Sequence, residues 1–302
     1  MTTPSQPPDE PQPQPQPQSN DDTTSSMKIP INPQRASTLT TNLEHIHSRI
    51  SSVFSQQPPS AQAHLPPSTP RLVAVSKLKP ASDILALHNP PTSHAHYGEN
   101  YVQELVEKSR LLPSSIKWHF IGGLQSNKAT QLARDVPSLW AVESVDSEKK
   151  ATLLDKGRAQ SESNTSNNTE EREPLRVFIQ VNTSGEESKS GVSPDSDWDE
   201  LVKLANHIRD KCEHLHLQGL MTIGAIARSK ATTPETENED FVCLRETRDK
   251  LAQALGTGPE SLELSMGMSD DFEGAIRQGS NQVRIGSTIF GERPAKKDAK
   301  VL

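Results

Sequence analysis

Eight short apolar runs recur along this chain, and each is followed by a polar stretch or by a stretch with helical periodicity. The runs are 71–77, 94–100, 117–123, 139–145, 176–183, 217–223, 261–269 and 282–290. Several are almost continuously apolar, which is typical of strands buried on both faces of a parallel sheet. The segments between them are predicted to be helices: 80–88, 102–112, 125–134, 147–158, 197–212, 240–255 and 270–278. Eight β/α units of this kind predict an α/β fold, a closed (β/α)₈ barrel of the TIM type.

The length of 302 residues suits one barrel of roughly 250 residues with additions. Residues 1–35 are rich in Pro and Gln and then in Ser, Thr and Asp, so they have too little apolar surface to offset the entropy of ordering. We expect a disordered tail there and a single barrel domain over 36–302. Apolar residues three or four apart predict a leading helix over 38–55, and the Ser/Asn/Glu-rich segment 160–173 is predicted to be a polar insertion.

Charge and cysteine usage exclude several classes of partner. The net charge is −7 and no basic stripe stands out, so we expect no binding to nucleic acid. The two cysteines have no spacing typical of a metal site or a disulfide framework, which favours a reducing compartment and no metal. No apolar run approaches the roughly 20 residues that span a bilayer, and no basic and apolar leader is evident. The sequence therefore predicts a cytoplasmic protein without a membrane segment.

The reactive residues of such barrels lie at the carboxyl ends of the strands. The first run ends in Ser76-Lys77, which places a lysine at the mouth of the predicted barrel. Such a lysine is often only a solvated charge. In an apolar setting its pKa falls, and the neutral amine becomes a nucleophile that can form a Schiff base with an aldehyde. The local sequence leaves both interpretations open.

The last two strands lead into glycine-containing segments, where barrels of this kind commonly bind phosphate. Gly267 and Gly286 would let an anion approach the backbone closely. Ser269 is either the N-cap of a helix that begins at Asp270 or a phosphate donor, and local sequence favours the cap. Arg284 lies inside an apolar run, where a buried guanidinium needs a specific acceptor, although a surface ion pair is the alternative.

Seven segments, in one order from Arg71 to Gly291, together resemble a known family. They are 74–80 (AVSKLKP), 98–104 (GENYVQE), 118–128 (WHFIGGLQSNK), 188–191 (SKSG), 219–221 (GLM), 267–271 (GMSDD) and 283–286 (VRIG). The chain resembles the pyridoxal phosphate homeostasis proteins, also called the proline synthetase co-transcribed homologue family. The fold of that family is like the barrel domain of alanine racemase.

The resemblance implies pyridoxal 5′-phosphate as the cofactor. It implies that Lys77 carries the cofactor as a Schiff base. Ser269 and the backbone of Gly286 and Ser287 would then hold the phosphate, and Arg284 would face the pyridine nitrogen.

Three further cofactor-binding residues follow from the same resemblance. Asn100 is expected beside the ring or its O3′ oxygen. His119 and Met221 are expected near the same mouth, with packing in the core as an equally good account of both. The proline-rich tail and the polar stretches 160–173 and 229–239 are additions that remove no matched residue.

The resemblance leaves two kinds of function, a carrier and an enzyme. An arginine at the pyridine nitrogen makes a weak electron sink, so a racemase would need a second base. In alanine racemase-like enzymes that base is a tyrosine from another domain, whereas this chain ends at Leu302, soon after Gly291. We therefore expect a non-enzymatic, monomeric protein of vitamin B6 homeostasis whose partners are the cofactor and pyridoxal phosphate-dependent apo-enzymes. An amino-acid racemase is the alternative, and a barrel for another phosphorylated ligand is a third.

Overall fold

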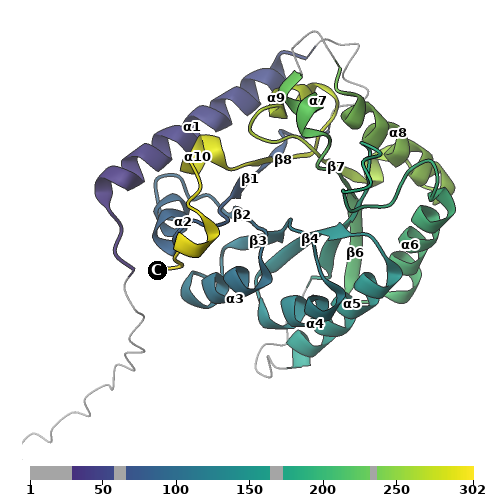
Figure 1. Ribbon diagram of the computed structural model, residues 1–302, viewed down its shortest axis with the longest axis horizontal. Coiled ribbons are helices and arrows are strands. Elements are labelled where there is room, and N and C mark those ends of the chain that lie inside the picture. The colour runs from purple at the N-terminus through teal and green to yellow at the C-terminus, as the bar shows by residue number, and fades with distance from the viewer. Residues whose placement is uncertain (1–28, 58–65, 164–172, 232–236) are drawn as a thin grey trace, which may run out of the picture.

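A closed barrel of eight parallel strands forms the centre of the computed structural model, which describes residues 29–57, 66–163, 173–231 and 237–302. Its strands follow one another around the ring in chain order (Figure 1). They are β1 Arg71–Val75, β2 His96–Glu99, β3 Lys117–Phe120, β4 Leu139–Val145, β5 Leu175–Gln180, β6 Leu215–Met221, β7 Glu263–Ser265 and β8 Gln282–Ile285. All eight predicted strands and the predicted (β/α)₈ class are confirmed.

Helices cover the outside of the ring. Those between successive strands are α2 Ala81–His88, α3 Val102–Leu111, α4 Ser126–Asp135, α5 Glu148–Ser163, α6 Trp198–Lys211, α8 Glu239–Ala254 and α9 Phe272–Arg277. The barrel closes where β8 pairs with β1, from Arg71 opposite Gln282 to Ala74 opposite Ile285. Outward-facing strand residues such as Leu72, Val283 and Ile285 join the helices in one large apolar core. Burial of this surface is the main driving force for closure.

The leading helix α1 spans Pro33–Ser55 and begins five residues earlier than predicted. The side chain of Asn32 accepts hydrogen bonds from the backbone N–H groups of Gln34 and Arg35, and Pro33 occupies the first helical turn, where no N–H is required. This cap sets the start, so the predicted tail boundary at residue 35 is wrong. Residues 1–28 of the predicted tail lie outside the described residues.

Helix α1 packs across the seam between the first and last units of the barrel (Figure 1). Leu39, Leu43, Ile46 and Ile50 are its buried stripe. The side chain of Asn42 donates to the carbonyl of Ile289 at 3.0 Å, within the short helix α10 (Ser287–Phe290). The helix therefore braces the loop that follows β8.

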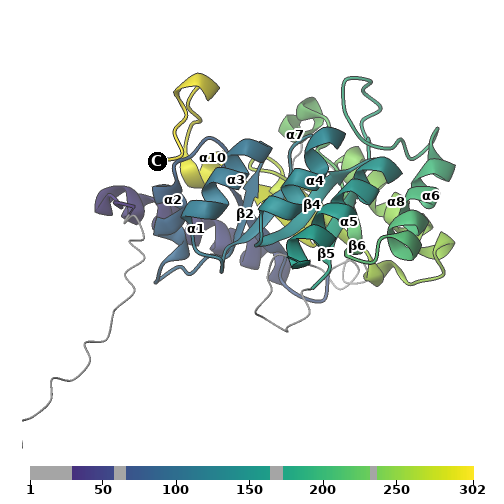
Figure 2. The same ribbon diagram turned by 90° about the horizontal axis from the view of Figure 1, so that it is seen from below.

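Two other elements depart from expectation. The six-residue helix α7, Ile226–Ala231, was not predicted, because a short helix inside a polar stretch has little periodicity. Helix α5 continues to Ser163, so the predicted insertion begins inside a helix, and its residues 164–172 lie outside the described part. In Figure 2, α7 and the C-terminal segment lie on the same side of the ring.

Within the described ranges, no helix is both long and apolar enough to cross a bilayer. The same residues contain no group of three or more His, Cys, Asp or Glu side chains that could hold a metal ion.

Candidate functional site

Lys77 follows the carboxyl end of β1, at the mouth of the barrel. The residue is partly buried, and its Nζ makes no hydrogen bond to another described residue. Burial lowers the pKa of Lys77, the charge of Arg293 lowers it further, and Glu99 and Glu104 oppose the shift. A larger fraction of the amine is therefore neutral than for an exposed lysine, which makes the nitrogen a better nucleophile.

A buried ion cluster fixes the backbone on both sides of Lys77. The Lys108 ammonium, which is fully buried, donates to the carbonyl of Ser76 at 2.8 Å and to carboxylate oxygens of Glu99 and Glu104, each at 2.7 Å. The same Glu104 oxygen accepts from the backbone N–H of Leu78 at 2.7 Å. Leu78 has a φ of 62°, a conformation unusual for a residue with a side chain. The cluster therefore stabilises a strained turn that presents Lys77.

The segments after β7 and β8 form a cup of small polar groups. The Ser269 hydroxyl accepts from the backbone N–H of Gly286 at 3.4 Å and lies 3.2 Å from the Ser287 hydroxyl. Helix α9 begins at Phe272 with Asp271 at its N-cap position, so the prediction that Ser269 caps a helix is wrong. Asp271 instead accepts from the N–H of Met268 at 2.6 Å and holds this turn. Ser269 therefore caps no helix, and its hydroxyl lies within the cup.

The cup adjoins the end of β1. A Cβ atom on Gly286 would lie 3.2 Å from the carbonyl oxygen of Val75 and 3.6 Å from Nη2 of Arg293. Glycine therefore favours the close approach of this segment to Val75, which lies two residues before Lys77. Arg293 was not among the predicted site residues, although it adds a positive charge next to the cup. The only signal in the sequence is its position two residues after Gly291.

Arg284 lies inside the barrel with 4% of its surface exposed, so the surface alternative is wrong. Its Nη1 donates to the Ser265 hydroxyl and its Nη2 to the carbonyl of Thr222, each at 2.6 Å. Thr222 directly follows β6, so the guanidinium lies toward the carboxyl ends of the strands.

The three remaining predicted residues differ in their surroundings. Asn100 follows β2, and its Oδ1 atom is buried without a hydrogen-bond partner among the described residues. Met221 is buried against Ala141 and Phe178 inside the barrel. His119 is fully buried, with one ring nitrogen bonded to Glu143 and the other to His96, so both of its polar atoms are already occupied.

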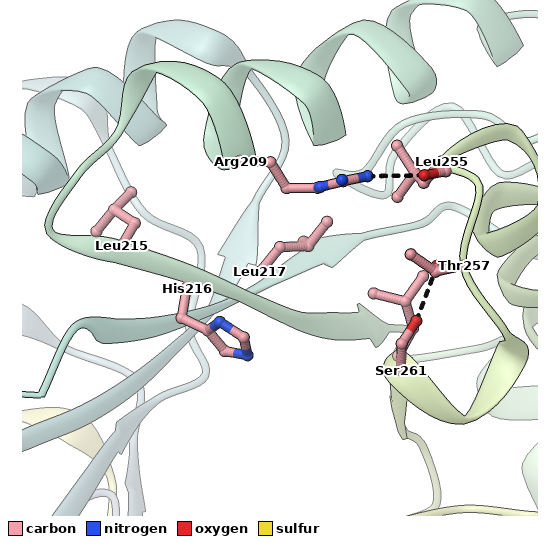
Figure 3. A pocket seen from close by; sticks show the side chains of 8 residues that line it. Arg209, Leu215, His216, Leu217, Leu255, Thr257 and Ser261 are labelled. Carbon is pink, nitrogen blue, oxygen red and sulfur yellow. Dashed lines mark hydrogen bonds between the residues drawn. The ribbon is translucent and has the colours of Figure 1, made fainter.

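Cavities mark both ends of the barrel. One of about 290 Å³ lies at the amino-terminal ends of β6 and β7 and is lined by Leu215, Leu217 and Leu255 (Figure 3). The guanidinium of Arg209, which lines this cavity, donates to the carbonyl of Leu255 at 3.1 Å. A second, of about 220 Å³, lies at the carboxyl ends of β3 to β5 and is lined by polar groups such as Ser144 and Gln180. The second shares a face with Lys77.

Comparison with known proteins agrees with this geometry. Residues 59–294 match the model of the alanine racemase N-terminal domain. A pyridoxal phosphate homeostasis protein of Caenorhabditis elegans is 47% identical over 75% of this chain and 87% of its own length. The Homo sapiens protein of the same description is 41% identical over 84% of this chain and 86% of its own.

This chain belongs to the pyridoxal phosphate homeostasis protein family. A solved structure of PipY from Synechococcus elongatus, with PLP bound, matches 81% of the chain and 99% of PipY, with a TM-score of 0.59 and 28% identity. Alanine racemase of Clostridium difficile has a TM-score of 0.57 at 16% identity and covers 86% of this chain but 58% of the racemase. The second likeness concerns the fold alone.

Proposed function

We propose that this family member binds pyridoxal 5′-phosphate through a Schiff base on Lys77 and serves the intracellular homeostasis of that cofactor. The observation that carries the proposal is the convergence of a lysine of lowered pKa with a cup of small polar groups on one face of the barrel. The PLP-bound PipY structure supports the same ligand.

The residues present fit this cofactor. The Ser269 and Ser287 hydroxyls and the N–H of Gly286 are suitable donors for a phosphate, and Arg293 supplies a positive charge beside them. The unpartnered Oδ1 of Asn100 is available to a polar group of the ring. When bound, the cofactor supplies an aldehyde and an electron-withdrawing ring.

The chain's own part begins with the neutral amine of Lys77, which adds to the aldehyde carbon. The carbonyl oxygen leaves as water when the C=N bond forms, so no oxidant or reductant is needed. Arg284 donates hydrogen bonds and cannot take up a proton, so it leaves a facing pyridine nitrogen neutral. A neutral ring withdraws electrons weakly, which favours holding the cofactor over amino-acid chemistry.

Tyr97 and His119 are two side chains that could act as the second base of a racemase, but both are bonded to other groups. The Tyr97 hydroxyl donates to the carbonyl of Ile84 at 3.1 Å, within the core outside the barrel. Both nitrogens of His119 have partners in the interior. These contacts leave Tyr97 and His119 engaged in the interior, which favours a carrier role over racemisation. Apo-enzymes that need the cofactor are the partners we propose. The cytoplasmic location and the monomeric state stay predictions.

The test is an absorbance spectrum of the purified full chain with pyridoxal 5′-phosphate, followed by borohydride reduction and peptide mass mapping. We expect a visible Schiff-base band and a phosphopyridoxyl adduct on Lys77, both lost in Lys77→Ala. Lys79→Ala is the neighbouring control and should keep the adduct on Lys77. No band and no adduct in the wild type would contradict the proposal, and turnover of L- or D-alanine that Lys77→Ala abolishes would favour a racemase.

A further inference from the structure

A column of polar side chains crosses the interior of the barrel and ends on Arg284. Its members are His96, His119, Glu143, Ser265 and Arg284, contributed by β2, β3, β4, β7 and β8. All but His96 are at most 4% exposed. Most barrels of this kind fill this space with branched apolar residues, so a polar interior needs an explanation.

The pleat of the strands directs these side chains inward. His119 stands between Trp118 and Phe120, which both pack in the large core outside the ring. Arg284 is flanked in the same way by Val283 and Ile285. Because successive residues of a strand point to opposite faces, the polar residue between two outward neighbours must face the barrel axis.

The hydrogen bonds have only one consistent set of donors. His119 Nδ1 lies 2.8 Å from one Glu143 oxygen, and His119 Nε2 lies 2.8 Å from Nδ1 of His96. Burial lowers the pKa of both imidazoles, that of His96 to about 2, so each ring carries one N–H. A carboxylate only accepts, hence His119 donates to Glu143 and accepts from His96.

The other side of Glu143 is equally determined. The Ser265 hydroxyl donates to the second Glu143 oxygen at 2.6 Å and accepts from Nη1 of Arg284. The amide of Gln282 donates to the first Glu143 oxygen at 2.7 Å and to the Ser265 hydroxyl at 3.0 Å, and its own oxygen accepts from Arg71 at 3.0 Å. Burial raises the pKa of Glu143, but the bonds from His119 and the charge of Arg284 outweigh it and hold the pKa below its ordinary value. Three donors, from His119, Ser265 and Gln282, therefore converge on the ionised Glu143 carboxylate.

We propose that Glu143, acting through Ser265 and oriented by His119 and His96, is the positioning residue that fixes the Arg284 guanidinium toward the cofactor ring. The Glu143 oxygen nearest Arg284 is 4.0 Å from Nη1, so the charges do not touch and the serine hydroxyl joins them. Burial lowers the pKa of Arg284, and Glu143 is the foremost charge that opposes this. This inference rests on the proposed cofactor, and it assigns to the barrel interior a role in how that cofactor is held.

Two buried serines allow a matched test. Ser265 and Ser280 are both fully buried, but the Ser280 hydroxyl bonds only backbone carbonyls, those of Leu264, Met266 and Gln282. Ser265→Ala and Ser280→Ala remove the same atom and leave the same volume. Only the first breaks the link between Glu143 and Arg284.

The experiment measures, on the purified full chain, the dissociation constant for pyridoxal 5′-phosphate and the position of the Schiff-base absorbance band. We expect Ser265→Ala to weaken binding about tenfold or more and to move the band, since it removes a hydrogen bond to a charged group. Ser280→Ala should leave both values within about twofold of the wild type. Melting of the apoprotein separates a general loss of stability from this local effect.

If Ser265→Ala does not fold, Glu143→Gln supplies the second test, because it keeps the shape of the side chain and removes its charge. We expect this variant, too, to bind pyridoxal 5′-phosphate more weakly and to move the Schiff-base band. If the affinity and the band are unchanged in Ser265→Ala, or in Glu143→Gln where that variant replaces it, the inference is overturned. The proposed function still stands in that case, provided the wild type shows the band. A wild type without any band would instead defeat the proposed function itself.

Discussion

Replacing Lys108 with methionine tests whether the buried ion cluster under the Lys77 turn stabilises the fold. The Lys108 ammonium is fully buried, and its three hydrogen bonds go to two carboxylates and one carbonyl. Methionine keeps most of the side-chain volume but leaves Glu99 and Glu104 without their counter-charge. Breaking a buried pair in this way costs about 3–5 kcal/mol.

The loss should depend on pH. Burial raises the pKa of Glu99 to about 7, against the opposing charge of Lys108 and with a further contribution from Glu104. Protonation relieves an uncompensated carboxylate, so Lys108→Met should lose less stability at pH 6 than at pH 8. Its affinity for pyridoxal 5′-phosphate should fall too, because the Ser76 carbonyl loses its donor next to Lys77.

The assay is urea unfolding of the wild type and the variant at the two pH values. Lys128→Met is the matched control, since Lys128 is exposed on α4 and bonds only Gln131, and it should change stability by less than about 0.5 kcal/mol. A loss below about 1 kcal/mol for Lys108→Met, or the same loss at both pH values, would refute this account of the cluster.

Three further predictions concern stability, each measured by urea unfolding. Leu43→Ala, in the buried stripe of α1, should cost about 2–5 kcal/mol, and a cost near zero would mean that α1 is not part of the cooperative unit. The pKa of Glu99 in the folded chain lies above its ordinary 4.5, so its contribution to the free energy of unfolding is complete below pH 4.5 and is lost as the pH rises through about 7. Glu99→Gln should therefore flatten the decline in stability between pH 5 and 8. An unaltered slope would assign that decline to another group. Gly267→Ala should cost about 1–3 kcal/mol more than Gly256→Ala, because both glycines have positive φ but only a Cβ on Gly267 would meet Ala275, at 2.5 Å; equal costs would contradict this steric argument.

Much of the fold could be predicted because strands buried on both faces are written in the sequence as continuous apolar runs. The run 139–145 coincides with β4, and the other seven contain or overlap their strands. The start of α1 was missed because the Asn32-Pro33 cap lies within a segment of tail-like composition. Helix ends depend on single side chains, so composition alone does not locate them.

The sequence predicted individual residues of the site better than the hydrogen bonds that join them. Strand ends and glycines pointed to Lys77, Gly286 and Ser269, and the resemblance supplied their expected roles. The links between Lys108 and Glu99, or between Glu143 and Ser265, depend on which residues face one another across strands and helices. A charged residue inside the apolar run 139–145 was the one available sign of Glu143.

The position of α1 also has a consequence for how the chain is made. Its apolar stripe packs on α2, which follows soon in the sequence, but equally on α9 and α10, which are among the last segments to be synthesised. At about 5–20 residues per second, roughly 10–50 s pass between completion of α1 and emergence of α10. During that interval the part of the stripe that packs on α9 and α10 has no native partner, and the edge of β1 that pairs with β8 is unpaired. A nascent chain of this protein therefore leaves part of an apolar helix face uncovered on the ribosome until its last segments emerge.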